Sequence, residues 1–150
     1  MKANPHTNFG SEVLNKMVQR LQGTDDSRKR YEYILWLAKK FDSMPEELQS
    51  EDFKVKGCVS NVYVLGELIE GKLQWQGHSD ALITKGLLVL LIKGLSNLTP
   101  DEVLAIDPSF VAATGLRSSL TPSRANGFLN ILLNMKAQAK KLELESSLTS

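Results

Sequence analysis

Apolar residues recur at helical spacing through the N-terminal part of the chain. A stripe at positions 13, 14, 17, 18 and 21 predicts a helix over residues 10–22, which Gly23 ends. A second stripe, at positions 31, 34, 35, 38 and 41, predicts a helix over residues 28–41, with the segment TDD (24–26) as its cap. Ser43 precedes Glu46 by the spacing of a capping box, which predicts a further short helix.

The pattern changes to that of β-strands between residues 53 and 77. The segment FKV (53–55) predicts a short strand. The segment SNVYVLGELIEGKLQWQG (60–77) is rich in β-branched and aromatic side chains and predicts two strands that meet near Glu70-Gly71. The middle of the chain therefore predicts a small antiparallel sheet.

The most apolar stretch follows the predicted strands and reads ALITKGLLVLLIKGL, residues 81–95. It is too short to cross a bilayer and is interrupted by lysines, so it predicts a buried helix. Ser79 or Asp80 is placed to cap this helix, and Gly94 is placed to end it. Gly86, inside the helix, predicts the close approach of another element.

Two later helix starts share a threonine–proline pair and differ at the third helical position. The segment TPDE (99–102) has a cap, a proline and a glutamate that completes a capping box. The segment TPSR (121–124) has an arginine in place of that glutamate. Because a positive charge in the first turn opposes the helix dipole, we expect Arg124 to serve another purpose. The last helix has an apolar side made of Phe128, Leu129, Ile131, Leu132, Met135, Ala139 and Leu142.

The order of these elements predicts the fold class. Helices come first, then a small antiparallel sheet, then helices again, which is typical of an α+β domain whose several helices cover one face of the sheet. We predict a single domain over residues 10–142, with flexible ends at residues 1–9 and 143–150.

Composition narrows the classes of partner and compartment. The chain has 150 residues and a formal net charge of +1. This near-neutral balance gives no reason to expect a nucleic-acid partner, and no segment predicts a membrane partner. A single cysteine excludes an intramolecular disulfide and fits a reducing compartment. The start, MKANPHTNFGSEV, has no apolar core of signal-peptide length, although the removal of a transit peptide stays open.

Cys58 has two interpretations. A lone cysteine is often only a small buried apolar residue. Here Gly57 precedes it at a junction between two predicted strands, and glycine allows backbone angles that lift the next side chain to a loop tip. Lys54 and Lys56 are close enough in sequence to stabilise a thiolate, and Ser60 keeps the surroundings polar. The residues alone leave both interpretations open.

The rest of the chain limits the chemistry of a thiol at Cys58. A cysteine hydrolase needs a histidine base, and the two histidines are His6, near the start, and His78, just after the predicted hairpin. His78 could approach Cys58, but its segment QGHSDA also fits a loop and a helix cap. One cysteine and one histidine are too few ligands for a zinc or iron–sulfur site. Redox sensing through a sulfenic acid and acceptance of sulfur as a persulfide remain.

Three segments of the chain are GCVSNVYV (57–64), GHSDALITKGL (77–87) and LTPSRANGF (120–128). In content, order and spacing they resemble the SufE family, the sulfur-acceptor partners of cysteine desulfurases. The resemblance covers residues 10–141. The matching positions are Gly57, Cys58, Ser60, Val62 and Tyr63 in the first segment, Gly77, Ser79, Asp80, Ala81, Lys85 and Gly86 in the second, and Leu120 to Arg124 in the third.

The chain departs from the family pattern at a few positions. Val59 and Asn61 stand where members often carry glutamine, and Tyr63 stands where tryptophan is common. His78 occupies a position that is often acidic. These departures concern the fine tuning of the loop and its choice of partner.

The resemblance implies a fold like that of the IscU-type scaffolds and a specific role for the thiol. A SufS-type, pyridoxal-phosphate-dependent desulfurase holds sulfur as a persulfide on its own cysteine. Cys58 would accept that sulfur, stimulate the desulfurase and deliver sulfur to an iron–sulfur scaffold. The chain would then be an accessory protein and not an enzyme, with no cofactor or metal of its own because pyridoxal phosphate belongs to the desulfurase.

The resemblance also marks residues that would support Cys58. Asp80 and Arg124 match family positions near the loop, where they are expected to pair, to hold the loop or to meet the desulfurase. Helix capping by Asp80 and a surface salt bridge of Arg124 are the alternatives. Gly57, Ser60 and His78 are the other candidates for support of the loop or the partner.

Some alternatives stay open at this point. A lone-cysteine redox sensor or thiol enzyme, and an adaptor with a buried Cys58, compete with the sulfur carrier. The expected compartment is a bacterial cytoplasm, or the plastid stroma if a transit peptide has been removed. The oligomeric state is open between a monomer and a homodimer.

Overall fold

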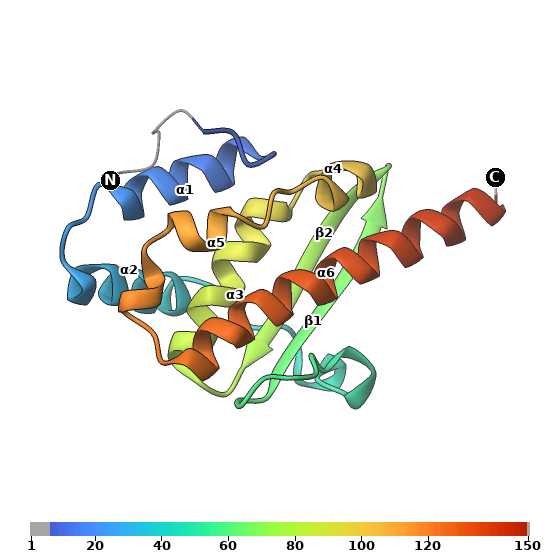
Figure 1. The fold of residues 1–150 in the computed structure, drawn as a ribbon. Helices are drawn as coiled ribbons and strands as arrows, with labels where there is room; N and C mark the ends of the chain where they lie inside the picture. The colour runs from blue at the N-terminus through green and yellow to red at the C-terminus, as the bar shows by residue number, and fades with distance from the viewer. Residues whose placement is uncertain (1–6, 150) are drawn as a thin grey trace.

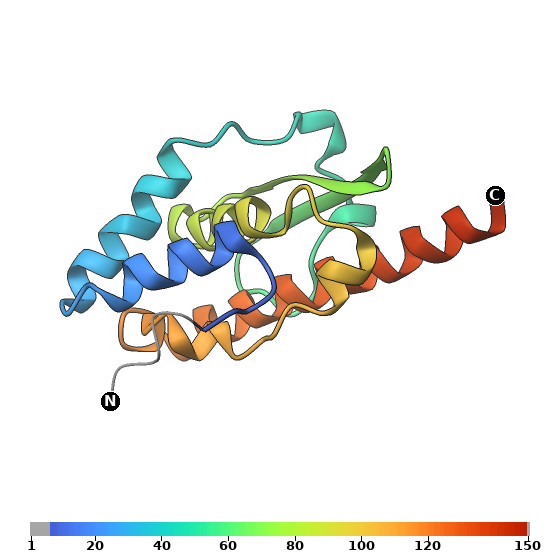
Figure 2. The same ribbon diagram turned by 90° about the horizontal axis from the view of Figure 1, so that it is seen from above.

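The computed structural model describes residues 7–149. His6, most of the predicted N-terminal end and Ser150 lie outside the described residues. The elements are α1 (Glu12–Gln22), α2 (Ser27–Lys39), η1 (Glu46–Leu48), η2 (Glu51–Phe53), β1 (Val62–Ile69), β2 (Lys72–Ser79), α3 (Leu82–Leu95), α4 (Pro100–Leu104), α5 (Phe110–Ala113), η3 (Leu116–Ser118) and α6 (Pro122–Thr149). Figures 1 and 2 show the hairpin of β1 and β2 with α3 and α6 on the same face. The predicted α+β class is confirmed.

The hairpin forms where the strand pattern predicts it. β1 and β2 pair antiparallel from Val62 opposite Ser79 to Ile69 opposite Lys72, joined by Glu70 and Gly71. Both turn residues have positive φ, as a two-residue turn between right-twisted strands requires. Alternate residues of each strand are buried, so one face of the hairpin contacts the helices and the other contacts solvent.

Helix α3 is the centre of the core. Eleven of its fourteen residues are buried, as expected of a helix that is apolar on all sides. Gly86 permits the tightest approach, because a Cβ there would collide with the backbone carbonyl oxygen of Ile34 in α2. This confirms the prediction of a close approach at Gly86.

Helix α6 crosses β1 and covers part of its outer edge. Gln138 places its amide against that edge: its Nε2 donates to the Val64 carbonyl oxygen (2.9 Å), and its Oε1 accepts from the Gly66 N–H (2.9 Å). One side chain thus pairs with two backbone groups that an additional strand would otherwise pair with.

Several helix ends follow the predicted capping, and others do not. Asp26 caps α2 through the Arg28 N–H, and Thr99 and Glu102 form the predicted capping box. At α3, however, the N-cap is Ala81 without a side-chain bond, so the predicted caps at Ser79 and Asp80 are wrong. α3 also continues past Gly94, because that glycine packs against Leu14 of α1 and does not turn the chain.

Two predictions between α2 and β1 are also wrong. The predicted strand at residues 53–55 is only a single bridge between Lys54 and Tyr63, because η2 occupies the residues just before it. η1 has no side-chain cap, and the Ser43 hydroxyl contacts the imidazole of His78 instead (Oγ to Nδ1, 2.9 Å).

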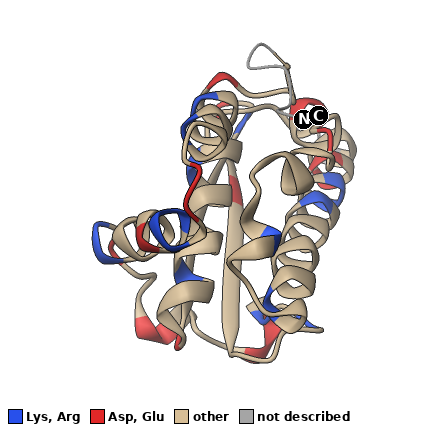
Figure 3. Ribbon diagram, turned by 60° about the vertical axis from the view of Figure 1, so that its left-hand side comes forward, with Lys and Arg blue, Asp and Glu red and all other residues tan. Residues whose placement is uncertain are grey.

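The predicted domain bounds of 10–142 stay a prediction. In the structure Phe9 is buried in the core, and α6 continues to Thr149. No helix within residues 7–149 is both long and apolar enough to cross a membrane. Lysine and arginine are interspersed with aspartate and glutamate on the face shown in Figure 3.

Candidate functional site

Cys58 lies in a short loop that leads into β1. Just before the loop, the Val55 N–H donates to the Val62 carbonyl oxygen (2.8 Å), which fixes the incoming chain beside the strand. The loop returns to β1 within a few residues, so Cys58 is held at the end of the hairpin remote from the Glu70-Gly71 turn.

The loop is attached to the protein body at both ends. At one end, Nδ2 of Asn130 in α6 donates to the Gly57 carbonyl oxygen (2.9 Å). Gly57 has a φ of +82°, which favours glycine, and a Cβ there would lie 2.7 Å from Asn130 Nδ2. At the other end, the Asp80 carboxylate accepts from the backbone N–H and the side-chain amide of Asn61 (3.1 Å each).

The thiol faces a small cavity between the beginnings of two helices. The cavity has a volume of about 10 Å³, and its lining is Cys58, Val59, Ser60, Thr84, Ser123, Arg124 and Gly127. That is room for about one water molecule. Thr84 is in the first turn of α3, and Ser123 and Arg124 are in the first turn of α6. The positive ends of both helix dipoles therefore lie near the sulfur.

The Cys58 sulfur is half-buried against α6. Its Sγ lies 3.8 Å from the Gly127 carbonyl oxygen, and a Cβ added at Gly127 would be in ordinary contact with Sγ, at 3.7 Å. Burial raises the pKa of the Cys58 thiol above its ordinary value of 9.0. The thiol is therefore mostly protonated at neutral pH in this conformation.

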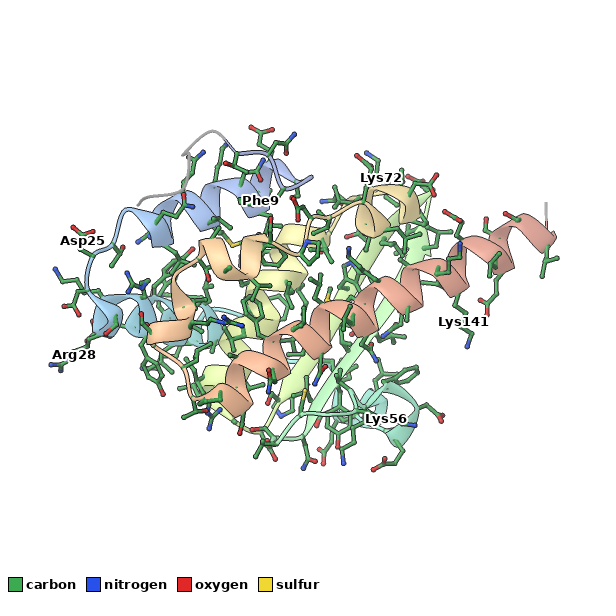
Figure 4. All side chains as sticks on the ribbon, viewed as in Figure 1. Phe9, Asp25, Arg28, Lys56, Lys72 and Lys141 are labelled. Carbon is green, nitrogen blue, oxygen red and sulfur yellow. The ribbon has the colours of Figure 1, made fainter. Side chains whose placement is uncertain are left out.

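The predicted support of a thiolate by lysines is not seen. Burial is the cause of the pKa shift of Cys58. Lys54 lies beside Glu51 instead (Nζ to Oε1, 3.7 Å). Lys56 is exposed at the surface (Figure 4).

Arg124 is placed at the cavity by a partner in another helix. Its Nη1 donates to Thr84 Oγ1 (2.9 Å), and Thr84 is buried, with 6% of its surface exposed. Arg124 and Asp80 both lie near the loop, but no ion pair joins them within the described residues; Asp80 holds Asn61. Arg124 thus lies beside Cys58 at the cavity, and its expected purpose beyond capping stays a prediction.

The other predicted residues take separate positions. Ser60 lines the cavity, while His78 bonds Ser43, and no bond joins it to Cys58 in the described part of the chain. Trp75 is buried, with its Nε1 donating to the Leu95 carbonyl oxygen (3.0 Å), whereas Tyr63 is partly exposed.

Sequence reasoning missed three residues that shape the site: Asn130, Thr84 and Gly127. Gly127 and Thr84 lie in segments that the family resemblance includes, whereas Asn130 lies just outside them. No local pattern marked Thr84 or Asn130, since each is a polar residue inside a helix whose partner is distant in the sequence.

Comparison with known sequences decides the family. The sequence model described as "SufE: Fe-S metabolism associated domain" matches residues 15–139. The chain belongs to the SufE family. An uncharacterised SufE-like protein of Synechocystis is 50% identical over 134 residues, covering 89% of this chain and 84% of that protein.

Other SufE relatives are longer than this chain. The cysteine desulfuration protein SufE of Plasmodium vivax is 45% identical over 130 residues, which are 83% of this chain and 51% of that protein. The chloroplastic/mitochondrial SufE-like protein 1 of Arabidopsis thaliana is 36% identical over 133 residues, 88% of this chain and 36% of that protein. The chain thus spans about half and about a third of the lengths of these two relatives.

A solved structure has the same fold. The solution structure of a hypothetical protein from Thermus thermophilus superposes with a TM-score of 0.76 at 27% identity. The match covers 93% of this chain and 98% of that one. Within residues 7–149 no group of three or more His, Cys, Asp and Glu side chains could hold a metal ion. The prediction that the protein has no cofactor of its own stays a prediction.

Proposed function

We propose that the protein carries sulfur on Cys58, accepting it from the persulfide of a pyridoxal-phosphate-dependent cysteine desulfurase of the SufS type. The protein also stimulates the desulfurase and delivers sulfur for iron–sulfur cluster assembly. The observation that carries this proposal is the position of the chain's single cysteine, on a doubly attached loop beside Arg124 and the beginnings of α3 and α6.

The transfer is a thiolate–persulfide exchange. The Cys58 thiolate attacks the outer sulfur of the desulfurase's Cys–S–SH group, so a new S–S bond forms at Cys58. The S–S bond of the donor breaks, its cysteine leaves as a thiolate, and the proton stays with the outer sulfur. No external oxidant or reductant is needed. With no second thiol in the chain, nothing within it can resolve the persulfide into a disulfide.

The surface beside Cys58 suits a protein partner. Val59, next to the thiol, has 83% of its surface exposed, and Leu82, at the beginning of α3, has 44% exposed. Contiguous exposed apolar patches mark protein–protein contacts, and in this proposal Val59 and Leu82 belong to such a contact. The relatives named for cysteine desulfuration support a desulfurase as that partner.

The relatives support two further parts of this proposal, the compartment and the recipient of the sulfur. A cyanobacterial relative and one named chloroplastic/mitochondrial support a bacterial cytoplasm or a plastid as the compartment. An iron–sulfur scaffold as the recipient rests on the family's description as associated with Fe-S metabolism.

The test combines the protein with a purified cysteine desulfurase, pyridoxal phosphate and cysteine, followed by intact mass spectrometry without reductant. We expect the wild-type chain to gain the mass of one sulfur atom and Cys58→Ser to gain none. With reductant present, we expect wild type, and not the variant, to accelerate sulfide release. Absence of added sulfur on the wild-type chain with SufS-type desulfurases would contradict the proposal.

A further inference from the structure

Cys58 is attached by contacts of unequal strength on its two sides. After the thiol, Asn61 and Asp80 share two side-chain bonds and a third from the Asp80 N–H to the Asn61 carbonyl oxygen (3.3 Å). Before the thiol, one solvent-accessible bond from Asn130 holds the Gly57 carbonyl oxygen. The weaker attachment is therefore the one on the side of Gly57.

The Asn130 contact and the sulfur contact lie on the same face of α6. Asn130 is one helical turn after Gly127, so the two residues share a face of α6. The same face thus binds the Gly57 carbonyl and contacts the Cys58 sulfur. When the Asn130 bond holds, the thiol is pressed against α6 and half-buried. Apart from the contact of the Cys58 sulfur with the Gly127 carbonyl oxygen, no other hydrogen bond in residues 7–149 joins Gly57 or Cys58 to α6.

We propose that Asn130 is a positioning residue that holds the Cys58 loop closed against α6, and that its release exposes the sulfur for transfer. This inference rests on the proposed function for its purpose, but the closed loop can be measured without any partner. Asn130 touches neither the sulfur nor a substrate, and it acts through the Gly57 carbonyl.

Two substitutions separate the hydrogen bond from the shape of the side chain. Asn130→Ala removes both the bond and the side chain. Asn130→Leu keeps a branched side chain of similar size but has no N–H to donate and adds no charge, so it faces the Gly57 carbonyl without a bond. Asn126→Ala is the matched control, because Asn126 is an exposed residue of the same type one turn earlier on α6.

The primary measurement is the rate at which iodoacetamide alkylates Cys58 in the isolated protein. In that reaction the thiolate sulfur bonds to carbon and iodide leaves. A hydrogen bond of ordinary net strength corresponds to about a 2- to 10-fold change in an equilibrium. We therefore expect both Asn130 variants to react about 2- to 10-fold faster than wild type, and Asn126→Ala to match wild type.

The pH profile supplies a readout that a general loss of stability would not produce. Opening the loop hydrates the thiol, so the midpoint of the alkylation rate should move to lower pH in both Asn130 variants. Arg124 of α6 is the charged group beside the thiol, and Thr84 of α3 and Ser60 of the loop are neutral. Thermal unfolding of each variant confirms that the assay is run on folded protein.

The outcomes divide clearly. Faster alkylation of both Asn130 variants with a shifted pH midpoint supports the closed loop. Faster alkylation of Asn130→Ala alone would show that packing, and not the bond, holds the loop, and the proposal fails. Rates equal to wild type, or slower, also overturn it. Because no desulfurase is present, these results stand even if sulfur acceptance by the wild-type chain is not found.

A transfer assay then connects the loop to sulfur carriage. Once wild type is shown to accept sulfur, the loaded Asn130 variants should lose it to a small thiol about 2- to 10-fold faster than loaded wild type. If the loaded variants and loaded wild type lose sulfur at equal rates, the closed loop does not protect the sulfur, and the proposed purpose of opening the loop is wrong.

Discussion

Helices α4 and α6 both begin after a threonine with a proline as the first helical residue, but the residue at the third helical position has a different partner in each. At α4, Thr99 and Glu102 exchange two bonds, from the Glu102 N–H to Thr99 Oγ1 (3.2 Å) and from the Thr99 N–H to Glu102 Oε1 (3.0 Å). At α6, Thr121 accepts from the Arg124 N–H (3.3 Å), but the arginine side chain turns away to Thr84. One start satisfies its own backbone, and the other supplies a charge to the cavity beside Cys58.

The difference shows how a local cost can mark a site. An arginine in the first turn opposes the dipole of α6 and cannot complete the capping box. The same side chain presents a positive charge at the cavity beside the Cys58 sulfur, which under the proposed function reacts as a thiolate. The same Thr-Pro motif at a helix N-terminus can therefore either complete a capping box or place a charge at a neighbouring site.

We expect the largest effect from giving the N-terminus of α6 the glutamate that α4 has at the same position. Arg124→Glu supplies the missing capping partner of Thr121 but places a carboxylate beside Cys58. A carboxylate beside a thiol disfavours the thiolate and raises the pKa of the thiol, so we expect about tenfold slower alkylation of Cys58 at neutral pH. Iodoacetamide kinetics measure this, and sulfur acceptance should fall in parallel.

The stability of Arg124→Glu is the internal control. Urea unfolding should show a variant at least as stable as wild type, because its helix start is better capped. A variant that is slow and also strongly destabilised would contradict the charge explanation.

Removing each threonine cap compares the two starts directly. Thr99→Ala should lower the free energy of unfolding by about 1 kcal/mol, and Thr121→Ala by less, because only Thr99 takes part in a reciprocal pair. Urea titration measures both. Thr99→Ala should leave sulfur acceptance unchanged. An equal loss of stability in the two variants would contradict the claim that only Thr99 takes part in a reciprocal cap.

We expect a smaller effect on sulfur acceptance from a change at Thr84, the residue to which the Arg124 side chain donates. Thr84→Val keeps the shape of a buried side chain but removes the acceptor of the Arg124 bond. We expect sulfur acceptance to fall about two- to threefold, since the arginine stays present but less fixed. The initial rate of mass gain measures it; a fall as large as that of Arg124→Glu would mean that Thr84 acts in some other way.

The smallest expected effect is the pH dependence of stability that Glu102 contributes at the N-terminus of α4. The backbone N–H of Thr99, and then its hydroxyl, hold the pKa of Glu102 below its usual 4.5. Such a group stabilises the fold above its ordinary pKa, and the contribution is lost as pH falls through the lower, folded-state pKa. Glu102→Gln keeps the capping geometry without the charge, so its stability difference from wild type should shrink between neutral pH and pH about 3. A difference independent of pH would contradict this assignment.

Much of the fold follows from local patterns. The hairpin at Glu70-Gly71, the buried apolar helix and the capping box at Thr99 are each fixed by residues close together in the sequence. The errors at Ser43 and Gly94 share a cause, because each has a tertiary contact that overrides its local preference. Ser43 meets His78, and Gly94 meets Leu14. Ser79 differs: it is the last residue of β2, and its hydroxyl accepts from the Ala81 N–H two residues on.

The site divides in the same way. Cys58 and its loop could be found from the sequence because glycine before a lone cysteine is a local signal and the family pattern includes it. The awkward charge of Arg124 in a first helical turn also gave a usable signal. Asn130 could not be found, because its bond to Gly57 joins residues 73 positions apart and nothing in its neighbourhood suggests a partner.

The amide of Gln138 against β1 has a consequence for how the protein behaves at high concentration. A two-stranded hairpin with a bare edge invites strands of other molecules to pair with it, which leads to insoluble assemblies. By occupying the Val64 carbonyl and the Gly66 N–H, a single side chain of α6 removes two of the groups that such growth would need. The helix whose beginning contacts the Cys58 sulfur thus also protects this edge of the hairpin, about three turns further along.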